Sequence, residues 1–242
     1  MIDTLPYTST IPFYKYVTNI HLFDLVVLVG PIGVFFGRVA NFINGELVGR
    51  VAPDNAWFKV KFPTEMAEWN EPSKFAKLEP VVEKVGVEKA QYIEWVQNYG
   101  SSVAARRSIN ETVNKLILAV QEGNEQVKTL LFDIIPSRYP SQLYAAMTEG
   151  IFVFLALWLY WKKPRKSGVV GAAFLVVYGL ARIANEQFRR PDLHLGYQLL
   201  GLTRGQWLSV GMVVIGIVLV AIWQKRNAEP VGGWGEPAKP QS

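Results

Sequence analysis

The chain has 242 residues, half of them hydrophobic, with eight Trp, no Cys and a net charge of +5. A soluble domain of this length spreads its charges more evenly than this chain does. Residues 51–138 carry most of the Glu and Lys, whereas four apolar stretches elsewhere carry almost none. This pattern predicts membrane spans around one polar excursion. It argues against a nucleic-acid-binding protein, because the basic residues do not form one continuous face.

Residue usage also limits the chemistry of the chain. The absence of cysteine excludes disulfides, thiolate nucleophiles and cysteine metal sites. His21 and His194 are the only histidines, so we expect no histidine-based metal site. The first 20 residues lack a basic region followed by an apolar run and a small-residue cleavage site, so we expect no signal peptide there.

Four helices are predicted to cross the membrane, because a helix rises about 1.5 Å per residue and these stretches can cover the hydrocarbon core. They comprise residues 21–43, 141–161, 168–188 and 206–224. In the first, Gly30 and Pro31 are expected to kink the helix, since proline cannot donate to the helix ladder. The connector between the second and third spans holds four basic residues and no acidic one, so the positive-inside rule predicts that it faces the cytoplasm.

The remaining segments follow from that arrangement. Residues 45–140 are expected on the outer side as a small, mostly helical extramembrane domain, since residues 72–98 and 103–132 show apolar residues at helical spacing. The simplest interpretation of this domain is a surface lid without chemistry. Residues 1–20 form an N-terminal segment, and the Gly- and Pro-rich tail, 225–242, is expected to be disordered. The predicted fold is an all-α integral membrane protein with about four transmembrane helices and a helical domain inserted after the first, residues 21–44.

Two polar clusters lie at the predicted outer ends of these spans. Arg38 and Asn41 are at i and i+3, so they share one helix face, and Arg182 and Glu186 are at i and i+4. Ionisable groups at membrane depth are costly and usually face a bundle interior or a water-filled cavity. Two guanidiniums can hold a phosphate through forked hydrogen bonds, which predicts a lipid head group as the ligand. The alternative is a helix-end ion pair of Arg182 with Glu186, and an Arg38 that only snorkels to head groups.

Four motifs make the prediction specific. In order along the chain they are GRVANFINGELVGR at 37–50, YPSQLY at 139–144, RIANEQFRRPD at 182–192 and GLTRGQWLS at 201–209. Together they resemble the motifs of the prolipoprotein diacylglyceryl transferase family. The resemblance implies transfer of the diacylglyceryl group from phosphatidylglycerol to the lipobox cysteine thiol of prolipoproteins, with release of glycerol phosphate. It implies no metal and no cofactor.

The resemblance also implies a setting and partners. The chain is expected to be a multi-pass protein of the bacterial cytoplasmic (inner) membrane, with its large loop in the periplasm and its C-terminus in the cytoplasm. Its partners would be phosphatidylglycerol, lipobox peptides and the lipid bilayer, and not nucleic acid. Family members usually have further N-terminal spans, which we expect to be absent from this chain. The alternative function is therefore a truncated, non-catalytic membrane protein that binds anionic lipid or lipoprotein precursors.

By motif match, the resemblance assigns roles to individual residues. Arg38 is implied as the phosphatidylglycerol-binding arginine and Arg182 as the second essential arginine. Glu186 is implied as the partner that orients Arg182 and is a candidate for the base that takes the thiol proton. Three further residues match signature positions and are expected to bind substrate, namely Asn41, Glu46 and Gly49. The alternatives are that Gly49 only permits the turn out of the membrane and that Glu46 only caps it.

Overall fold

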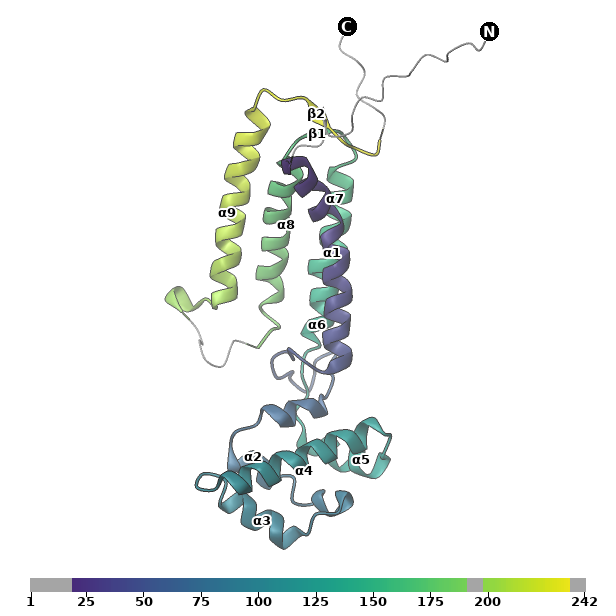
Figure 1. The fold of residues 1–242 in the computed structure, drawn as a ribbon, viewed down its shortest axis with the longest axis vertical. Coiled ribbons are helices and arrows are strands. Elements are labelled where there is room, and N and C mark those ends of the chain that lie inside the picture. The colour runs from purple at the N-terminus through teal and green to yellow at the C-terminus, as the bar shows by residue number, and fades with distance from the viewer. Residues whose placement is uncertain (1–18, 191–197, 236–242) are drawn as a thin grey trace, which may run out of the picture. The chain divides into compact units, whose positions relative to one another are not determined.

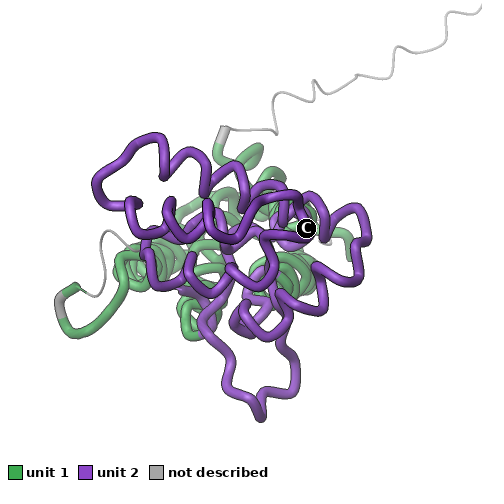
Figure 2. The backbone as a smooth tube through the Cα atoms, turned by 90° about the horizontal axis from the view of Figure 1, so that it is seen from below, with its two compact units in different colours: residues 1–38, 143–187, 191–242 green, residues 39–142, 188–190 purple. Residues whose placement is uncertain are grey.

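The computed structural model describes residues 19–190 and 198–235, and the chain divides into two compact units (Figure 2). Unit 1 comprises residues 1–38, 143–187 and 191–242, and unit 2 comprises residues 39–142 and 188–190. The N-terminal segment expected at residues 1–20 lies almost wholly outside the described residues. Pro191 and Asp192 of the third motif, His194 and residues 236–242 of the tail also lie outside the described residues.

Unit 1 is built from apolar helices that Figure 1 shows side by side. They are α1 (Asn19–Asn44, whose last residues belong to unit 2), α6 (Ser141–Ala145, whose first two residues also belong to unit 2), the π-helix η4 (Ala146–Phe152), α7 (Val153–Tyr160), α8 (Val169–Asn185), the short η5 (Leu199–Gly201) and α9 (Arg204–Lys225). Three helical stretches of the described chain are long and apolar enough to cross a membrane, namely Ile20–Asn44, Ser141–Tyr160 and Arg204–Lys225. The helices predicted from the apolar stretches are therefore present, and α8 is apolar but shorter. The number of crossings stays a prediction.

Small residues allow the helices of unit 1 to approach closely. A Cβ atom on Gly179 of α8 would lie 3.0 Å from the carbonyl oxygen of Ser209 on α9. A Cβ atom on Gly216 of α9 would lie 2.9 Å from the carbonyl oxygen of Ala172 on α8. Such contacts are typical of helix pairs in membranes, where packing and not hydrophobic collapse drives association. The faces that point away from the helix contacts keep exposed apolar side chains, among them Val26, Val29, Phe36, Phe152, Leu159, Val214, Ile217 and Ile222.

A buried carboxylate joins α1 to the start of α8. Asp24 is 2% exposed, and its two oxygens accept hydrogen bonds from the backbone N–H groups of Gly168 (2.6 Å) and Gly171 (2.7 Å). Gly168 is the N-cap residue of α8, and as a glycine it has no side chain that could cap the helix. Asp24 therefore satisfies two N–H groups that the first turn leaves without partners, and its negative charge complements the helix dipole.

Unit 2 is a helical domain around one apolar core. Its helices are η2 (Pro63–Glu68), α2 (Pro72–Ala76), η3 (Val82–Val85), α3 (Lys89–Gln97), α4 (Val103–Gln121) and α5 (Glu125–Ile134). The most buried core side chains include Met66, Phe75, Leu78, Tyr92, Ile109, Leu116, Val127 and Leu131. The two stretches with helical spacing are broken into shorter helices at turns with positive φ, at Gly86 (74°) and Gly123 (84°), because glycine adopts this conformation without strain.

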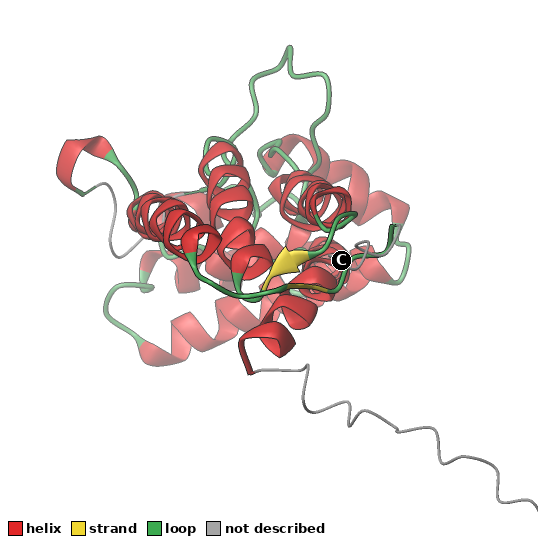
Figure 3. Cartoon of the chain, turned by 90° about the horizontal axis from the view of Figure 1, so that it is seen from above, coloured by secondary structure: helices red, strands yellow, loops and turns green. Residues whose placement is uncertain are grey.

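The C-terminal tail is partly ordered within unit 1. Strand β1 (Arg165–Lys166) pairs antiparallel with β2 (Pro230–Val231) in the small sheet of Figure 3. The Trp234 ring stacks on Trp158 with 4.3 Å between centroids, and its indole N–H donates to the Trp158 carbonyl at 2.8 Å. The expectation of disorder from residue 225 therefore differs from the structure as far as Gly235, because this aromatic contact fixes the tail; residues 236–242 lie outside the described part.

Candidate functional site

Unit 1 contains a buried cluster in which one carboxylate holds two guanidinium groups. The Glu149 side chain on η4 is fully buried. Its Oε2 atom accepts a hydrogen bond from Arg38 of α1 at 2.8 Å, and its Oε1 atom accepts one from Arg182 of α8 at 3.0 Å. Asn185, one turn after Arg182, donates its side-chain N–H to the same Oε1 atom at 3.1 Å. The cluster therefore brings three helical segments together around Glu149.

The helix that carries Glu149 is itself unusual. Residues Ala146–Phe152 form a π-helix, a form that is rare and is frequently found at functional sites. Next to Glu149, Gly150 lies against α1, and a Cβ atom there would sit 2.9 Å from Phe35 Cα. Phe35 is one turn before Arg38, so this close backbone approach brings Glu149 within reach of the Arg38 side chain.

Glu186 occupies the edge of this cluster. Its Oε1 atom accepts a hydrogen bond from the Thr203 hydroxyl at 2.8 Å, and its Oε2 atom lies 3.8 Å from Arg182. Thr203 also caps α9 through a capping box with Gln206, so Glu186 is fixed to the start of that helix. Sequence spacing indicated Glu186 as the partner that orients Arg182, but in the structure the shorter contact comes from Glu149.

The cluster keeps hydrogen-bonding capacity for a ligand. The Arg38 and Arg182 side chains are 19% and 16% exposed, and each guanidinium contributes one nitrogen to Glu149 although it carries five N–H donors. Because both groups reach one carboxylate, they are close enough to hold one tetrahedral anion. Two buried acceptors, Asn185 Oδ1 and Glu186 Oε2, have no hydrogen-bond partner within the described residues. The arrangement can therefore bind a phosphate and can accept a hydrogen bond or a proton beside it.

The rest of the signature, from Asn41 onward, lies in unit 2 and forms a turn held by the second motif. Gly45 and Leu47 both have positive φ, 68° and 53°, and this conformation is uncommon for leucine. The side-chain amide of Gln142 donates to the Glu46 carbonyl at 2.6 Å, and the Ser141 hydroxyl donates to the Leu47 carbonyl at 3.3 Å. The Ser-Gln pair of YPSQLY therefore holds the backbone of the GEL turn.

Gly49 is required by space and not by backbone conformation. It forms a bridge with Arg189, and a Cβ atom at Gly49 would overlap the Tyr139 carbonyl and lie 2.8 Å from the Phe188 carbonyl. The buried Arg138 donates to both oxygens of Glu65 and, at 3.4 Å, to the Gly49 carbonyl. The three motifs are thus joined within unit 2 around a glycine that no other residue can replace without movement of the backbone.

The structure divides the six predicted site residues between the two units. Unit 1 brings together Arg38, Arg182 and Glu186, whereas Asn41, Glu46 and Gly49 belong to unit 2. The Asn41 side chain is half-buried and its carbonyl accepts the Glu46 N–H at 2.9 Å, while the Glu46 side chain is exposed. Their contribution to substrate binding stays a prediction.

Sequence reasoning missed Glu149, the centre of the cluster, together with Asn185 and Thr203. Glu149 lies in a segment that we treated as the polar start of the second span. A single carboxylate within an otherwise apolar helix was the available signal, because such groups at membrane depth usually serve a function. Within the described residues, no group of three or more His, Asp or Glu side chains lies close enough to hold a metal ion.

Comparison with known proteins gives one consistent result. The family model for prolipoprotein diacylglyceryl transferase matches residues 7–222. The chain is 46% identical over 220 residues to the phosphatidylglycerol–prolipoprotein diacylglyceryl transferase of Bdellovibrio bacteriovorus, and 36% identical over 197 residues to that of Neisseria gonorrhoeae. The first alignment covers 90% of this chain and 62% of the relative, and the second covers 81% and 53%. The chain therefore spans between half and two thirds of the length of these relatives.

Proposed function

This chain belongs to the prolipoprotein diacylglyceryl transferase family, and we propose that it transfers the diacylglyceryl group of phosphatidylglycerol to the lipobox cysteine of a prolipoprotein. The observation that carries the proposal is the convergence of Arg38 and Arg182 on Glu149, at 2.8 and 3.0 Å. Two fixed guanidiniums in an apolar helical unit suit a lipid phosphate, because arginine keeps its charge on burial and its N–H groups match phosphate oxygens.

The main task of catalysis in this reaction is to stabilise the negative charge that develops on the phosphate. The cysteine sulfur attacks the carbon of the diacylated glycerol that bears the phosphate. A C–S bond forms there, and the bond between that carbon and the phosphate oxygen breaks. The thiol proton passes to a base, and glycerol phosphate leaves with one more negative charge than the phosphodiester carried. Arg38 and Arg182 would stabilise that developing charge, and fixed donors are most effective when they are aimed at charge that grows in the transition state.

Two carboxylates have separate roles in this scheme. Glu149 positions the arginines, since it bonds to both and has no exposed surface. Glu186 is the base that takes the thiol proton, and its support is the buried Oε2 atom that has no hydrogen-bond partner within the described chain. Asn41, Glu46 and Gly49 would contribute to substrate binding, Gly49 by keeping the signature turn compact and the other two through their side chains.

We place the chain in the bacterial inner membrane, with α1, the Ser141–Tyr160 helix, α8 and α9 as four crossings. The support is the apolar length of these helices and the basic connector Lys162–Lys166. In this layout the connector and the C-terminus face the cytoplasm, and unit 2 faces the periplasm. A cysteine that reacts at the outer ends of the helices belongs to an exported precursor.

A transfer assay on this chain tests the proposal. Purified protein in micelles that contain phosphatidylglycerol is incubated with a lipobox peptide, and mass spectrometry measures the diacylglyceryl adduct on the cysteine. We expect an adduct that Arg38→Ala abolishes and that the exposed control Arg107→Ala leaves intact. A folded chain that binds the lipid but never yields the adduct would instead identify a non-catalytic lipid-binding protein.

A further inference from the structure

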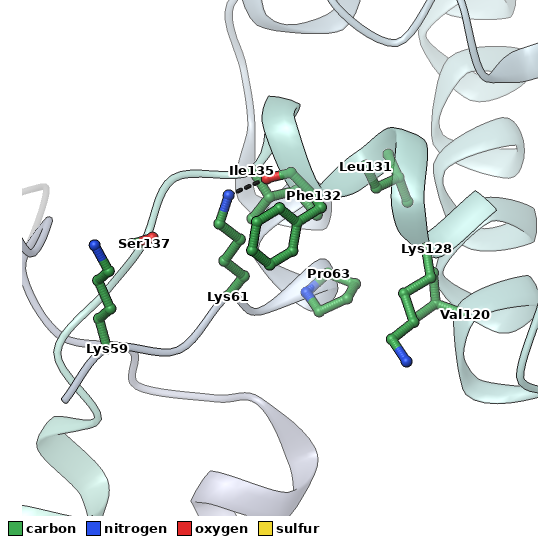
Figure 4. A pocket seen from close by; sticks show the side chains of 9 residues that line it. All are labelled: Lys59, Lys61, Pro63, Val120, Lys128, Leu131, Phe132, Ile135 and Ser137. Atoms are coloured by element: carbon green, nitrogen blue, oxygen red, sulfur yellow. Dashed lines mark hydrogen bonds between the residues drawn. The ribbon is translucent and has the colours of Figure 1, made fainter. Parts of the chain in front are cut away.

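Unit 2 contains a cavity of about 410 Å³ that the chemistry above does not use. Its floor is formed by Leu131 and Ile135, which are 1% and 3% exposed, and its walls include Val120, Pro63 and the Phe132 ring (Figure 4). A volume of this size lies within the range of small-molecule sites, which are mostly apolar with a few polar groups at defined places.

Three lysines line the cavity, and no acidic residue does. Lys61 lies along the Phe132 ring with its Nζ atom 3.9 Å from the ring centroid, and Lys59 and Lys128 are to either side in the view of Figure 4. The Lys61 ammonium donates to the Phe132 carbonyl and has no carboxylate within ion-pair distance in the described chain. The cavity therefore combines an apolar interior with a cationic rim.

The other two lysines have only exposed acidic neighbours. Lys128 bonds to Glu125 at 2.9 Å on the surface of α5, and Lys59 donates to the Asp54 carbonyl at 2.6 Å with the Asp54 carboxylate 3.8 Å away. Exposed pairs of this kind contribute little free energy, so both ammonium groups can exchange these partners for a more highly charged one.

We propose that this cavity binds an anionic phospholipid, with one acyl chain in the apolar interior and the phosphate at the lysine rim. Lysine suits this arrangement, because its aliphatic stem can cover the chain while its ammonium group reaches the head group. A ligand that satisfies both parts of the cavity must itself have a long apolar part and a negative charge at one end.

A neighbouring segment supports a lipid ligand over an acidic peptide. Directly before Lys59, Trp57 is 99% exposed and Phe58 is 38% exposed, and the two rings contact each other. Exposed Trp beside Lys is typical of segments that enter the interface between lipid head groups and acyl chains. The segment that supplies two of the rim lysines, Lys59 and Lys61, therefore also carries exposed aromatic side chains that can contact a lipid surface.

Photo-crosslinking on the full chain tests this site. The probe is phosphatidylglycerol with a diazirine at the end of one acyl chain, in nanodiscs of phosphatidylcholine, and mass spectrometry maps the labelled residues. We expect label at Val120 and within residues 131–135. Lysines near an anionic lipid contribute about 1 kcal/mol each, about fivefold in binding, so the triple Lys→Gln variant at 59, 61 and 128 should lose at least tenfold of this label. Val120→Trp, which fills the cavity without a change in charge, should lose it as well.

Matched controls separate this site from general charge effects. Lys77, Lys84 and Lys89 are exposed in the same unit and outside the cavity, so their triple Gln variant should keep the label. The proposal would be overturned if Val120 and residues 131–135 carried no label, or if a phosphatidylcholine probe labelled them equally. It would also be overturned if inorganic phosphate alone or an acidic peptide displaced the probe. The labelling does not depend on transfer, so it can fail or succeed independently of the adduct assay.

Discussion

Replacement of Glu149 by Gln tests the centre of the arginine cluster. The substitution keeps the shape of the side chain but leaves Arg38 and Arg182 without their shared charge. Loss of one partner from a buried ion pair costs about 3–5 kcal/mol, and we expect the lower end because the guanidiniums are 19% and 16% exposed. About 3 kcal/mol corresponds to a fall of about 6–12 °C in the unfolding temperature of a chain of this size.

The same substitution should reduce transfer by about 100-fold, since a small displacement of positioning groups has effects of that order. The loss should fall mainly on kcat, because the arginines are needed most when the phosphate gains charge. Both quantities are measured in the same micelles, the unfolding temperature by tryptophan fluorescence and the rate by adduct formation. Glu149→Asp keeps the charge and should recover part of the rate.

The control for this experiment is Glu111→Gln. Glu111 pairs with Arg107 on an exposed face of α4 at 3.0 Å, and loss of such a pair changes stability by less than about 0.5 kcal/mol. If Glu149→Gln unfolds at the parent temperature and transfers at the parent rate, the carboxylate does not hold the arginines and the reasoning fails.

Four further substitutions test other parts of the structure. Gly49→Ala forces a Cβ atom into a neighbouring carbonyl and should lower the unfolding temperature by several degrees, whereas Gly100→Ala, with open space around it, should be neutral. Asp24→Ala removes two bonds to the first turn of α8 and should cost about 1–2 kcal/mol in thermal unfolding, and an unchanged transition would contradict the capping role. Burial raises the pKa of Tyr92 above its ordinary 10.0, so its hydroxyl contributes stability below pH 10 that is lost as the pH rises further. The Tyr92 hydroxyl also donates a hydrogen bond to the Phe75 carbonyl at 3.0 Å, so Tyr92→Phe should be less stable than the parent at pH 8 by about 1 kcal/mol, and the difference in unfolding temperature should shrink above pH 10. Glu186→Gln should abolish transfer while lipid binding survives, and full activity of that variant would exclude Glu186 as the base.

The helices were predictable because their signals are local. Apolar runs at helical spacing lie within each segment, and residues 168–188 and 206–224 correspond closely to α8 and α9. The breaks in unit 2 were less visible, since Gly86 and Gly123 interrupt apolar patterns that continue on both sides of them. Pairing of Arg182 with Glu186 also followed from local spacing, and the structure keeps that contact, although at 3.8 Å.

The centre of the cluster was not predictable from spacing. Glu149 is separated from Arg38 by 111 positions and from Arg182 by 33, so no helical periodicity connects them. The close approach at Gly150 that allows the contact depends on the path of α1 and not on the residues around Glu149. Gly49 is similar, because the carbonyl groups that exclude a side chain come from the second and third motifs.

The charge of the cluster explains why two carboxylates accompany the two arginines. Arg38, Arg182, Glu149 and Glu186 sum to zero, which is the least costly arrangement in an apolar unit. A phosphodiester adds one negative charge, and the leaving glycerol phosphate would add another. If Glu186 takes the thiol proton as the C–O bond breaks, it becomes neutral while the phosphate gains its charge. The net charge of the site would then stay constant through the step, which favours a proton acceptor beside the arginines and supports the proposal that Glu186 has this role.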